Sequence, residues 1–380
     1  MRKPPKNIVF YIVIFRNRRI IDYFIRNTDN VKVWFMQTES SLEYRKLQVT
    51  GGSTYIVSLP RKWINDHGLT QSDVVGVEYL GTGEIQITPN EIKKLKRKAV
   101  IDLKKYPSGS LYDYLIGVYV SGCDIIEIKQ KGGLGTKVVR IVRKFLRDTR
   151  GMEITNHTSD TLEIISLLNP NELPLQVSLN RMYLLVTSLV EDTLAVINGE
   201  DIDSISDYED RERQIDARRL LVDRQVAMAL NSPIIERTLG VGRYQAMEHA
   251  SMARALERMG DHAHILSSLV YDAKGKVGIE SDSLPMLLLP VWSSALSSII
   301  RNTYSKEITT LTEAKESLHA AIQDLEEHED KLMESSEKAK NVILEFRISE
   351  ITRRLCGYSI DMAETLINML MSARMENVDE

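Results

Sequence analysis

The sequence predicts a multidomain protein with a strand-rich N-terminal unit, a small central α/β domain and an all-α C-terminal region. Three observations lead to this fold class. Short β-branched runs separated by glycine pairs fill residues 44–89, and strand-like and helix-like segments then alternate as far as a Pro/Asn-rich linker at 169–174. Beyond residue 177, apolar side chains recur at helical spacings of three and four. The chain has 380 residues, which is enough for roughly two to four domains.

Residues 1–35 are basic and contain an apolar run from Ile8 to Phe15. That run is shorter than the ~20 residues that a membrane-spanning helix needs, so no membrane span is expected there. Arg16 and its basic neighbours stand where a signal peptide would be cleaved. We expect residues 1–35 to be a disordered extension or the product of a start codon placed upstream of Met36. A basic helix that lies on a membrane is the alternative.

Residues 36–90 are predicted to form a compact β-rich unit. Lys46–Thr50 and Thr54–Leu59 are typical of strands, Arg61–His67 of a short helix, and Val74–Tyr79 and Glu84–Thr88 of a hairpin. The stretch Thr-Gly-Gly-Ser-Thr-Tyr-Ile-Val-Ser-Leu-Pro-Arg-Lys-Trp resembles the AbrB/SpoVT family. The resemblance implies a swapped-hairpin β-barrel that forms only between two chains, hence a homodimer, and that often binds DNA.

The candidate DNA contacts in this unit are basic and polar side chains. They are Arg45, Lys46, Gln48, Thr50, Arg61 and Lys62. Basic residues of this kind contact backbone phosphates, which gives salt-dependent affinity but little reading of base sequence. Acidic residues such as Asp66 and Glu78 lie among them, so a solvated surface on a dimerisation unit is the competing interpretation.

Residues 91–170 begin with a Lys-rich connector and continue as the central α/β domain. The expected strands are Val100–Leu103, Cys123–Lys129, Met152–Asn156 and Thr161–Ile165, and the expected helices are Gly109–Ser121 and Thr136–Asp148. The chain's two cysteines, Cys123 and Cys356, form no disulfide framework. They suit a reducing compartment, so we expect a cytoplasmic protein.

The C-terminal region is predicted to contain two similar sets of three helices, at 177–275 and 284–375. The first set is expected at Val177–Asn198, Asp201–Leu230 and Ile234–Tyr271, with a break at Gly240–Gly242. After a linker, the second set is expected at Met286–Lys306, from Thr312 to about Lys340, and on to Ala373. The two sets read as a degenerate repeat.

Two acidic pairs in the first set are the strongest functional signal. Glu212 and Asp216 stand four residues apart on one predicted helix, and Glu257 and Asp261 do so on another, so each pair shares a helix face. A solvated face is the ordinary explanation of such pairs. However, Glu212 interrupts the apolar seam of its helix, and a charge placed there needs a partner or a metal.

The stretch Leu256 to Ala263, Leu-Glu-Arg-Met-Gly-Asp-His-Ala, resembles the signature of the PhoU family of phosphate-uptake regulators. The resemblance implies two three-helix bundles in tandem and metal clusters held by such acidic pairs on adjacent helices. His264 shares the helix face of Asp261 and is the one imidazole candidate ligand. A divalent or trivalent ion is expected, with iron, manganese, zinc and magnesium as the options, and imidazole would favour the first three.

The second bundle is expected to have lost part of this site. Glu326 and Asp330 keep the four-residue spacing on its middle helix. On the last helix, Arg353 stands where Glu257 stands in the first set, and Gly357 where Asp261 stands. We therefore expect metal in the first bundle only, or a much weaker second site, with Arg353 neutralising Glu326.

The two resemblances together imply a non-enzymatic, metal-binding regulator of phosphate uptake that acts on a phosphate transporter or signalling protein, and on DNA as a further partner. A DNA-binding transcription factor that senses metal or phosphate is the first alternative. A ferritin-like di-metal oxidase is the second. That enzyme needs Glu-x-x-His motifs on two helices, and the best match here is the single stretch Asp261–His264.

Overall fold

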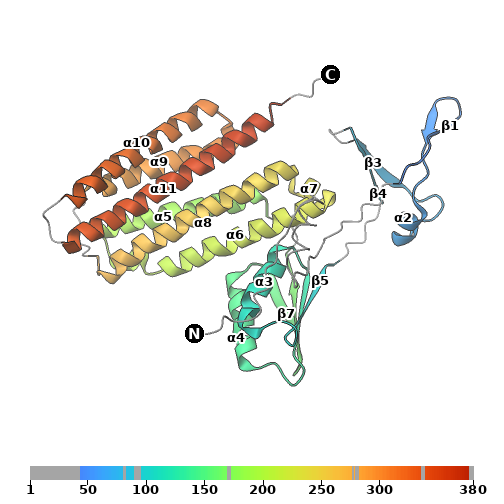
Figure 1. The fold of residues 1–380 in the computed structure, drawn as a ribbon, viewed down its shortest axis with the longest axis horizontal. Coiled ribbons are helices and arrows are strands. Elements are labelled where there is room, and N and C mark those ends of the chain that lie inside the picture. Colours follow the sequence, from blue (N-terminus) through green and yellow to red (C-terminus); the bar gives the residue numbers. More distant parts are fainter. Residues whose placement is uncertain are drawn as a thin grey trace, which may run out of the picture. The chain divides into compact units, whose positions relative to one another are not determined.

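The computed structural model describes residues 43–79, 83–89, 96–168, 173–275, 278, 282–334 and 339–375. The chain divides into two compact units, Met1–Lys94 and Leu95–Glu380. The extension expected at 1–35 lies outside the described residues. Figure 1 shows strands and one short helix in the first unit, and a sheet with two helices followed by long helices in the second.

The N-terminal unit consists of two antiparallel hairpins and a short helix. β1 (Gln48–Thr50) pairs with β2 (Thr54–Ile56), and β3 (Val75–Tyr79) pairs with β4 (Ile85–Pro89), with α2 (Arg61–Asp66) between them. Every side chain of β1 and β2 is exposed, and Pro89 is the one buried residue that the structure describes in this unit. Isolated two-stranded hairpins are marginal in water, and residues 43–79 and 83–89 of one copy do not by themselves form the core that a stable domain needs.

The central domain is a four-stranded sheet with two helices on one face. β5 (Lys98–Asp102) lies at one edge, parallel to β6 (Ile125–Lys129), and the order continues through β8 (Thr161–Ser166) to β7 (Met152–His157). A short 3-10 turn, η1 (Ser108–Ser110), leads into α3 (Leu111–Val120), and α4 (Thr136–Asp148) follows β6. Both helices bury their apolar side chains against the same sheet face, in one core with Ile126 and Ile164.

The first bundle contains three long helices, α5 (Leu175–Ile197), α6 (Tyr208–Asn231) and α8 (Arg243–Asp272). The single helix expected from Asp201 is instead a 3-10 turn, η3 (Ile202–Ile205), followed by α6, because the Asp201 side chain accepts a 3.1 Å hydrogen bond from the Asp203 amide and caps that turn. The expected break at Gly240–Gly242 separates α7 (Pro233–Leu239) from α8.

The second bundle consists of α9 (Leu284–Ser305), α10 (Ile308–Met333) and α11 (Ala339–Ser372), and it shares one apolar core with the first. Polar contacts join the two bundles. Gln176 of α5 donates to Thr303 of α9 at 2.8 Å, and the Ser359 hydroxyl of α11 lies 3.5 Å from Met259 Sδ of α8. Figure 1 shows the helices of both bundles running alongside one another.

Among the described helices, α9 alone is long and apolar enough to cross a membrane by length and composition. Its inner side chains are those of a core helix. Trp292, Leu296 and Ile299 are fully buried, and the Trp292 indole donates to Ser359 of α11 at 2.9 Å. The apolar character of α9 therefore has a structural explanation within the second bundle.

The central domain packs directly on α6 of the first bundle. Leu220 of α6 belongs to the apolar core of the central domain. Arg224 of α6 is buried, donates to the backbone carbonyl of Tyr119 at 2.8 Å and lies over the ring of that tyrosine. The helix that carries Glu212 and Asp216 is therefore held from two sides.

Candidate functional site

Three carboxylates converge between α6 and α8. Glu212 and Asp216 stand one turn apart on α6 and share a face, while Asp261 faces them from α8. Each residue offers one oxygen, and these oxygens all lie within 4.8 Å of one another. All three side chains are half-buried. We call Glu212, Asp216 and Asp261 the carboxylate cluster.

A glycine beside the cluster lets the two helices approach each other. Gly260 is buried in α8, and a methyl group placed on it would lie 3.0 Å from Cδ1 and 3.1 Å from Cγ2 of Ile215 on α6. Ile215 precedes Asp216, and Gly260 precedes Asp261. The close contact between Ile215 and Gly260 therefore sets the distance between Asp216 and Asp261.

Burial and mutual repulsion make the cluster reluctant to ionise. Burial, followed by the charges of Glu212 and Asp261, raises the pKa of Asp216 to about 6. Burial and then Asp261 likewise raise the pKa of Glu212. A raised pKa means that the ionised carboxylates are destabilised, and a bound cation would stabilise them. A set of oxygen ligands suits hard ions such as Mg²⁺ and Mn²⁺. The residues present thus fit a metal.

Glu257, the fourth sequence candidate, lies at the margin of the cluster. It is not among the three residues whose oxygens converge, although burial and the charge of Asp261 raise its pKa. Arg219 approaches it to 3.8 Å and Arg258 to 3.7 Å. Arg258 also lies 3.7 Å from Asp261. Glu257 is therefore already partly neutralised by protein cations.

The imidazole candidate, His264, also lies outside the converging set. Its ring centroid stands 5.1 Å from that of Tyr208, at the start of α6. A spacing of three residues places His264 on the same face as Asp261 but almost a turn farther along the axis. There its ring packs against the ring of Tyr208. The donor set that the structure brings together is accordingly all carboxylate.

Asp148, at the end of α4, is a neighbour of the cluster that sequence reasoning missed. Its charge contributes to raising the pKa of both Glu212 and Asp216. Tyr112 of α3 donates to Asp148 at 2.8 Å, and Asp216 in turn contributes to raising the Tyr112 pKa. No motif connects Asp148 with the helical pairs, because it belongs to another domain and reaches α6 only through the packing of the tertiary structure.

In the second bundle, an arginine stands in place of the missing carboxylate. Arg353 lies 3.8 Å from Glu326, as expected from the sequence, and its Nε lies 3.3 Å from Glu329, which is buried. Asp330 is exposed, and a methyl group on Gly357 would meet open space. Among the described residues of this bundle, no set of three acidic side chains brings its oxygens as close together as the carboxylate cluster does.

The six DNA candidates of the N-terminal unit are all exposed. Gln48 and Thr50 alternate on β1 and so share one face of that strand, while Arg61 and Lys62 open α2. Arg45 forms an ion pair with Glu43, whereas Lys46 makes no described ion pair. The cationic groups are thus accessible to a polyanion, on a unit that has almost no core.

Comparison with known families matches two of these regions. Residues 179–270, which span α5 to α8, match the PhoU domain family. Residues 48–95 match the family of the MazE bacterial antitoxin, described as antidote-toxin recognition. No curated protein and no solved structure matches the chain significantly.

Both matching families are regulatory rather than enzymatic. The match at 48–95 covers the hairpin unit with an AbrB-like arrangement, and the match at 179–270 covers the bundle that carries the carboxylate cluster. The chain therefore combines a MazE/AbrB-like domain at residues 48–95 with a PhoU domain at residues 179–270.

Proposed function

We propose that the chain is a metal-binding regulator of phosphate homeostasis that works in the cytoplasm through protein partners. The observation that carries this proposal is the convergence of Glu212, Asp216 and Asp261 inside the region that matches the PhoU domain. Phosphate regulation is the function that this family suggests. The partner would be a phosphate transporter or a signalling protein.

The proposed ion is held by the carboxylate cluster, with Glu257 at its margin. It supplies positive charge between α6 and α8, where the carboxylates repel one another. Because His264 lies outside the converging oxygens, magnesium and manganese fit this donor set better than zinc, with iron between them. Binding would fix the two helices against each other and so fix the surface that they present to a partner.

Phosphate uptake by the cells that naturally carry this chain tests the proposal. Deletion of the chain should alter the dependence of uptake on external phosphate, and wild-type protein should restore it. Asp216→Asn combined with Asp261→Asn should fail to restore it. Asp210→Asn is the matched control, because Asp210 is an exposed carboxylate on the same helix and forms its ion pair with Arg213, at 2.9 Å. Full restoration by the double variant would contradict a metal-dependent role.

DNA binding by the N-terminal unit is the second candidate activity, and the MazE-family match favours it. Domains of this type are typically dimeric and bind DNA. We infer that two copies of this unit complete one barrel, because the part of one copy that the structure describes buries only Pro89. Arg61 and Lys62 would then contact phosphates from the start of α2.

Electrophoretic mobility shift of a duplex by the full chain tests this activity. Binding should weaken steeply with added salt, and Arg61→Ala with Lys62→Ala should weaken it at every duplex sequence. Lys104→Ala with Lys105→Ala is the control, since both are exposed lysines of the central domain. Equal shifts by the two double variants would remove the assignment of DNA binding to Arg61 and Lys62.

The oxidase alternative has its own test. Consumption of oxygen by the full chain in the presence of ferrous iron would support that alternative.

A further inference from the structure

The central sheet has one blunted edge and one open edge. At β7, the register shifts between Ile154 and Asn156, which is the kind of irregularity that discourages pairing with another strand. β5 pairs with β6 without any such shift. Just before β5 the Arg97 carbonyl accepts from the Ile125 amide, and just after it the Leu103 amide donates to the Lys129 carbonyl, so both bond toward β6. Backbone groups alternate sides along a strand, so those of Lys98, Val100 and Asp102 face away from the sheet.

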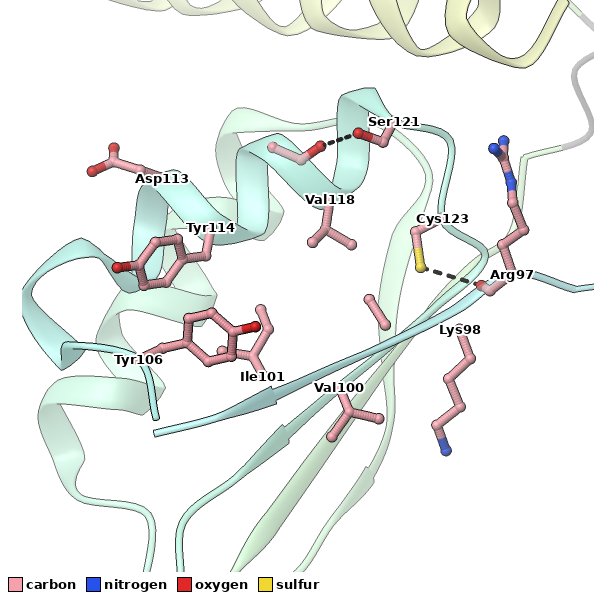
Figure 2. A pocket seen from close by; sticks show the side chains of 12 residues that line it. Arg97, Lys98, Val100, Ile101, Tyr106, Asp113, Tyr114, Val118, Ser121 and Cys123 are labelled. Atoms are coloured by element: carbon pink, nitrogen blue, oxygen red, sulfur yellow. Dashed lines mark hydrogen bonds between the residues drawn. The ribbon is translucent and has the colours of Figure 1, made fainter. Parts of the chain in front are cut away.

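A groove runs along this open edge, between β5 and α3. Its cavity volume is about 540 Å³. Figure 2 shows Tyr106, Tyr114 and Val118 above the strand, and Val100 and Lys98 on its other side. Val100 is 46% exposed although it sits in the middle of the strand. Apolar side chains thus flank a row of backbone groups that, apart from the Asp102 carbonyl, have no hydrogen-bond partner among the described residues, and such a row is the usual surface for adding a strand.

Gly117 lies in the middle of α3 and lines the same groove. A glycine inside a helix costs about 1 kcal/mol relative to alanine. The described part of the chain gives no packing reason for this cost, because a methyl group placed on Gly117 would meet no described atom within 4 Å apart from its own stretch of helix. A glycine in open space beside an open strand edge indicates close approach by something outside this copy of the chain.

We propose that β5 and α3 form an interface with a second copy of this chain, in which the two β5 strands pair antiparallel about Val100. The two Val100 residues exchange their backbone hydrogen bonds, and the helices approach each other at Gly117. The pairing extends the two central sheets into one continuous sheet.

Charge complementarity favours a second copy in this register. Antiparallel pairing about Val100 sets Lys98 of each copy opposite Asp102 of the other, on the same face of the sheet. The Asp102 carbonyl already accepts hydrogen bonds from Lys105 and Tyr106, but its amide remains available to the Lys98 carbonyl of the partner copy. The Lys98 amine already pairs with Glu127 at 2.9 Å and Glu163 at 3.7 Å in its own chain, so in the interface it would bridge these carboxylates and Asp102 of the partner copy.

The N-terminal unit would bring the two strands into reach of each other. Eight residues separate Pro89, at the end of β4, from Lys98, at the start of β5. A linker of that length spans at most roughly 26 Å. If the N-terminal units of two chains complete one barrel, as proposed above, the two β5 strands are tethered at high local concentration. The interface is additional to that barrel and is tested separately.

Site-specific cross-linking of the full chain tests the interface. With a short bifunctional maleimide, Val100→Cys should give a covalent dimer at high yield. Asn156→Cys, an exposed position on the opposite edge strand, should not. The wild-type chain gives the background, since Cys123 and Cys356 are both buried. Equal yields at positions 100 and 156 would overturn the proposal.

Two further sets of variants separate a specific interface from chance collision. Gly117→Gln in the Val100→Cys chain should reduce the cross-link to the level of the Asn156→Cys control, without loss of thermal stability. Asp102→Lys should reduce it, because this change sets two lysines opposite each other across the paired strands, whereas Asp102→Asn should leave most of it. Equal yields for these two variants would contradict the paired register. A yield that rises only when residues 1–35 are deleted would assign the groove to that segment instead.

Discussion

Asp216 of α6 and Asp261 of α8 bring carboxylate oxygens to within 4.8 Å of each other, on helices that a glycine allows to approach closely. Two acidic groups in such a half-buried position destabilise the folded chain when both are ionised. The same arrangement is well suited to a cation. The expected properties of the protein follow from this conflict between stability and ion binding.

Replacing Asp216 by asparagine should stabilise the metal-free protein near neutral pH. The amide keeps the size of the side chain and removes a charge whose ionisation the site opposes. The midpoint of thermal unfolding in a chelating buffer should therefore rise. The same variant should lose any increase in that midpoint caused by added Mn²⁺ or Mg²⁺. A lower midpoint in the chelating buffer would contradict the electrostatic account.

The stability of the metal-free protein should depend on pH in the direction set by the raised pKa of Asp216. The carboxyl titrates at about 6 in the folded chain and near its ordinary value of 3.8 when unfolded. Between these values the folded state binds more protons, so the free energy of unfolding falls as pH rises. Below about pH 4 the contribution is fully present, and above about pH 6 it is lost. Urea unfolding across this interval should show a steeper fall in wild type than in Asp216→Asn, which keeps the smaller contribution of the raised pKa values of Glu212 and Glu257.

Gly260→Ala should weaken ion binding more than it weakens the fold. The added methyl group meets Ile215 at 3.0 Å and forces α6 and α8 apart, which separates the carboxylates. Gly357→Ala is the matched control in α11, since nothing lies within 4 Å of its added methyl group and helix propensity gains about 1 kcal/mol. Thermal shift by Mn²⁺ should shrink in the first variant and stay unchanged in the second. Equal shifts would mean that Gly260 does not set the helix separation.

Arg353→Ala should destabilise the second bundle substantially. Glu329 is buried, and removal of Arg353 leaves its charge with only a 2.9 Å hydrogen bond from Ser349. Breaking a buried ion pair from one side costs about 3 kcal/mol. Arg354→Ala is the control, because its 3.7 Å pair with Glu350 is exposed on both sides and is worth about 0.5 kcal/mol. Urea unfolding that showed equal losses for the two would contradict the role given to Arg353.

Local signals predicted much of the fold. The start of α4 after Gly135 and the break before α8 at Gly240 follow from glycines that precede or end regular segments. The start of β5 was misplaced by two residues, because Lys98 reads as part of a basic connector. In the structure its amine pairs with Glu127 at 2.9 Å and with Glu163 at 3.7 Å on neighbouring strands. These ion pairs depend on tertiary contacts, which the spacing of residues along the sequence does not encode.

The candidate site likewise has features that helical spacing predicts and features that depend on tertiary contacts. Helical spacing placed Glu212 with Asp216 correctly on one face, but it could not decide which member of the second pair turns inward. The structure brings Asp261 into the cluster and leaves Glu257 among arginines. The approach of Asp148 from the central domain depends on packing between domains and had no signal in the sequence.

Elemental analysis of the purified full chain tests the central claim most directly. Wild type and Asp210→Asn should retain a stoichiometric divalent or trivalent metal after dialysis, while Asp216→Asn and Asp261→Asn should each lose it. Equal metal content in all four proteins, or none in any of them after growth with added manganese, magnesium, iron and zinc, would contradict the assignment of Glu212, Asp216 and Asp261 as a metal centre.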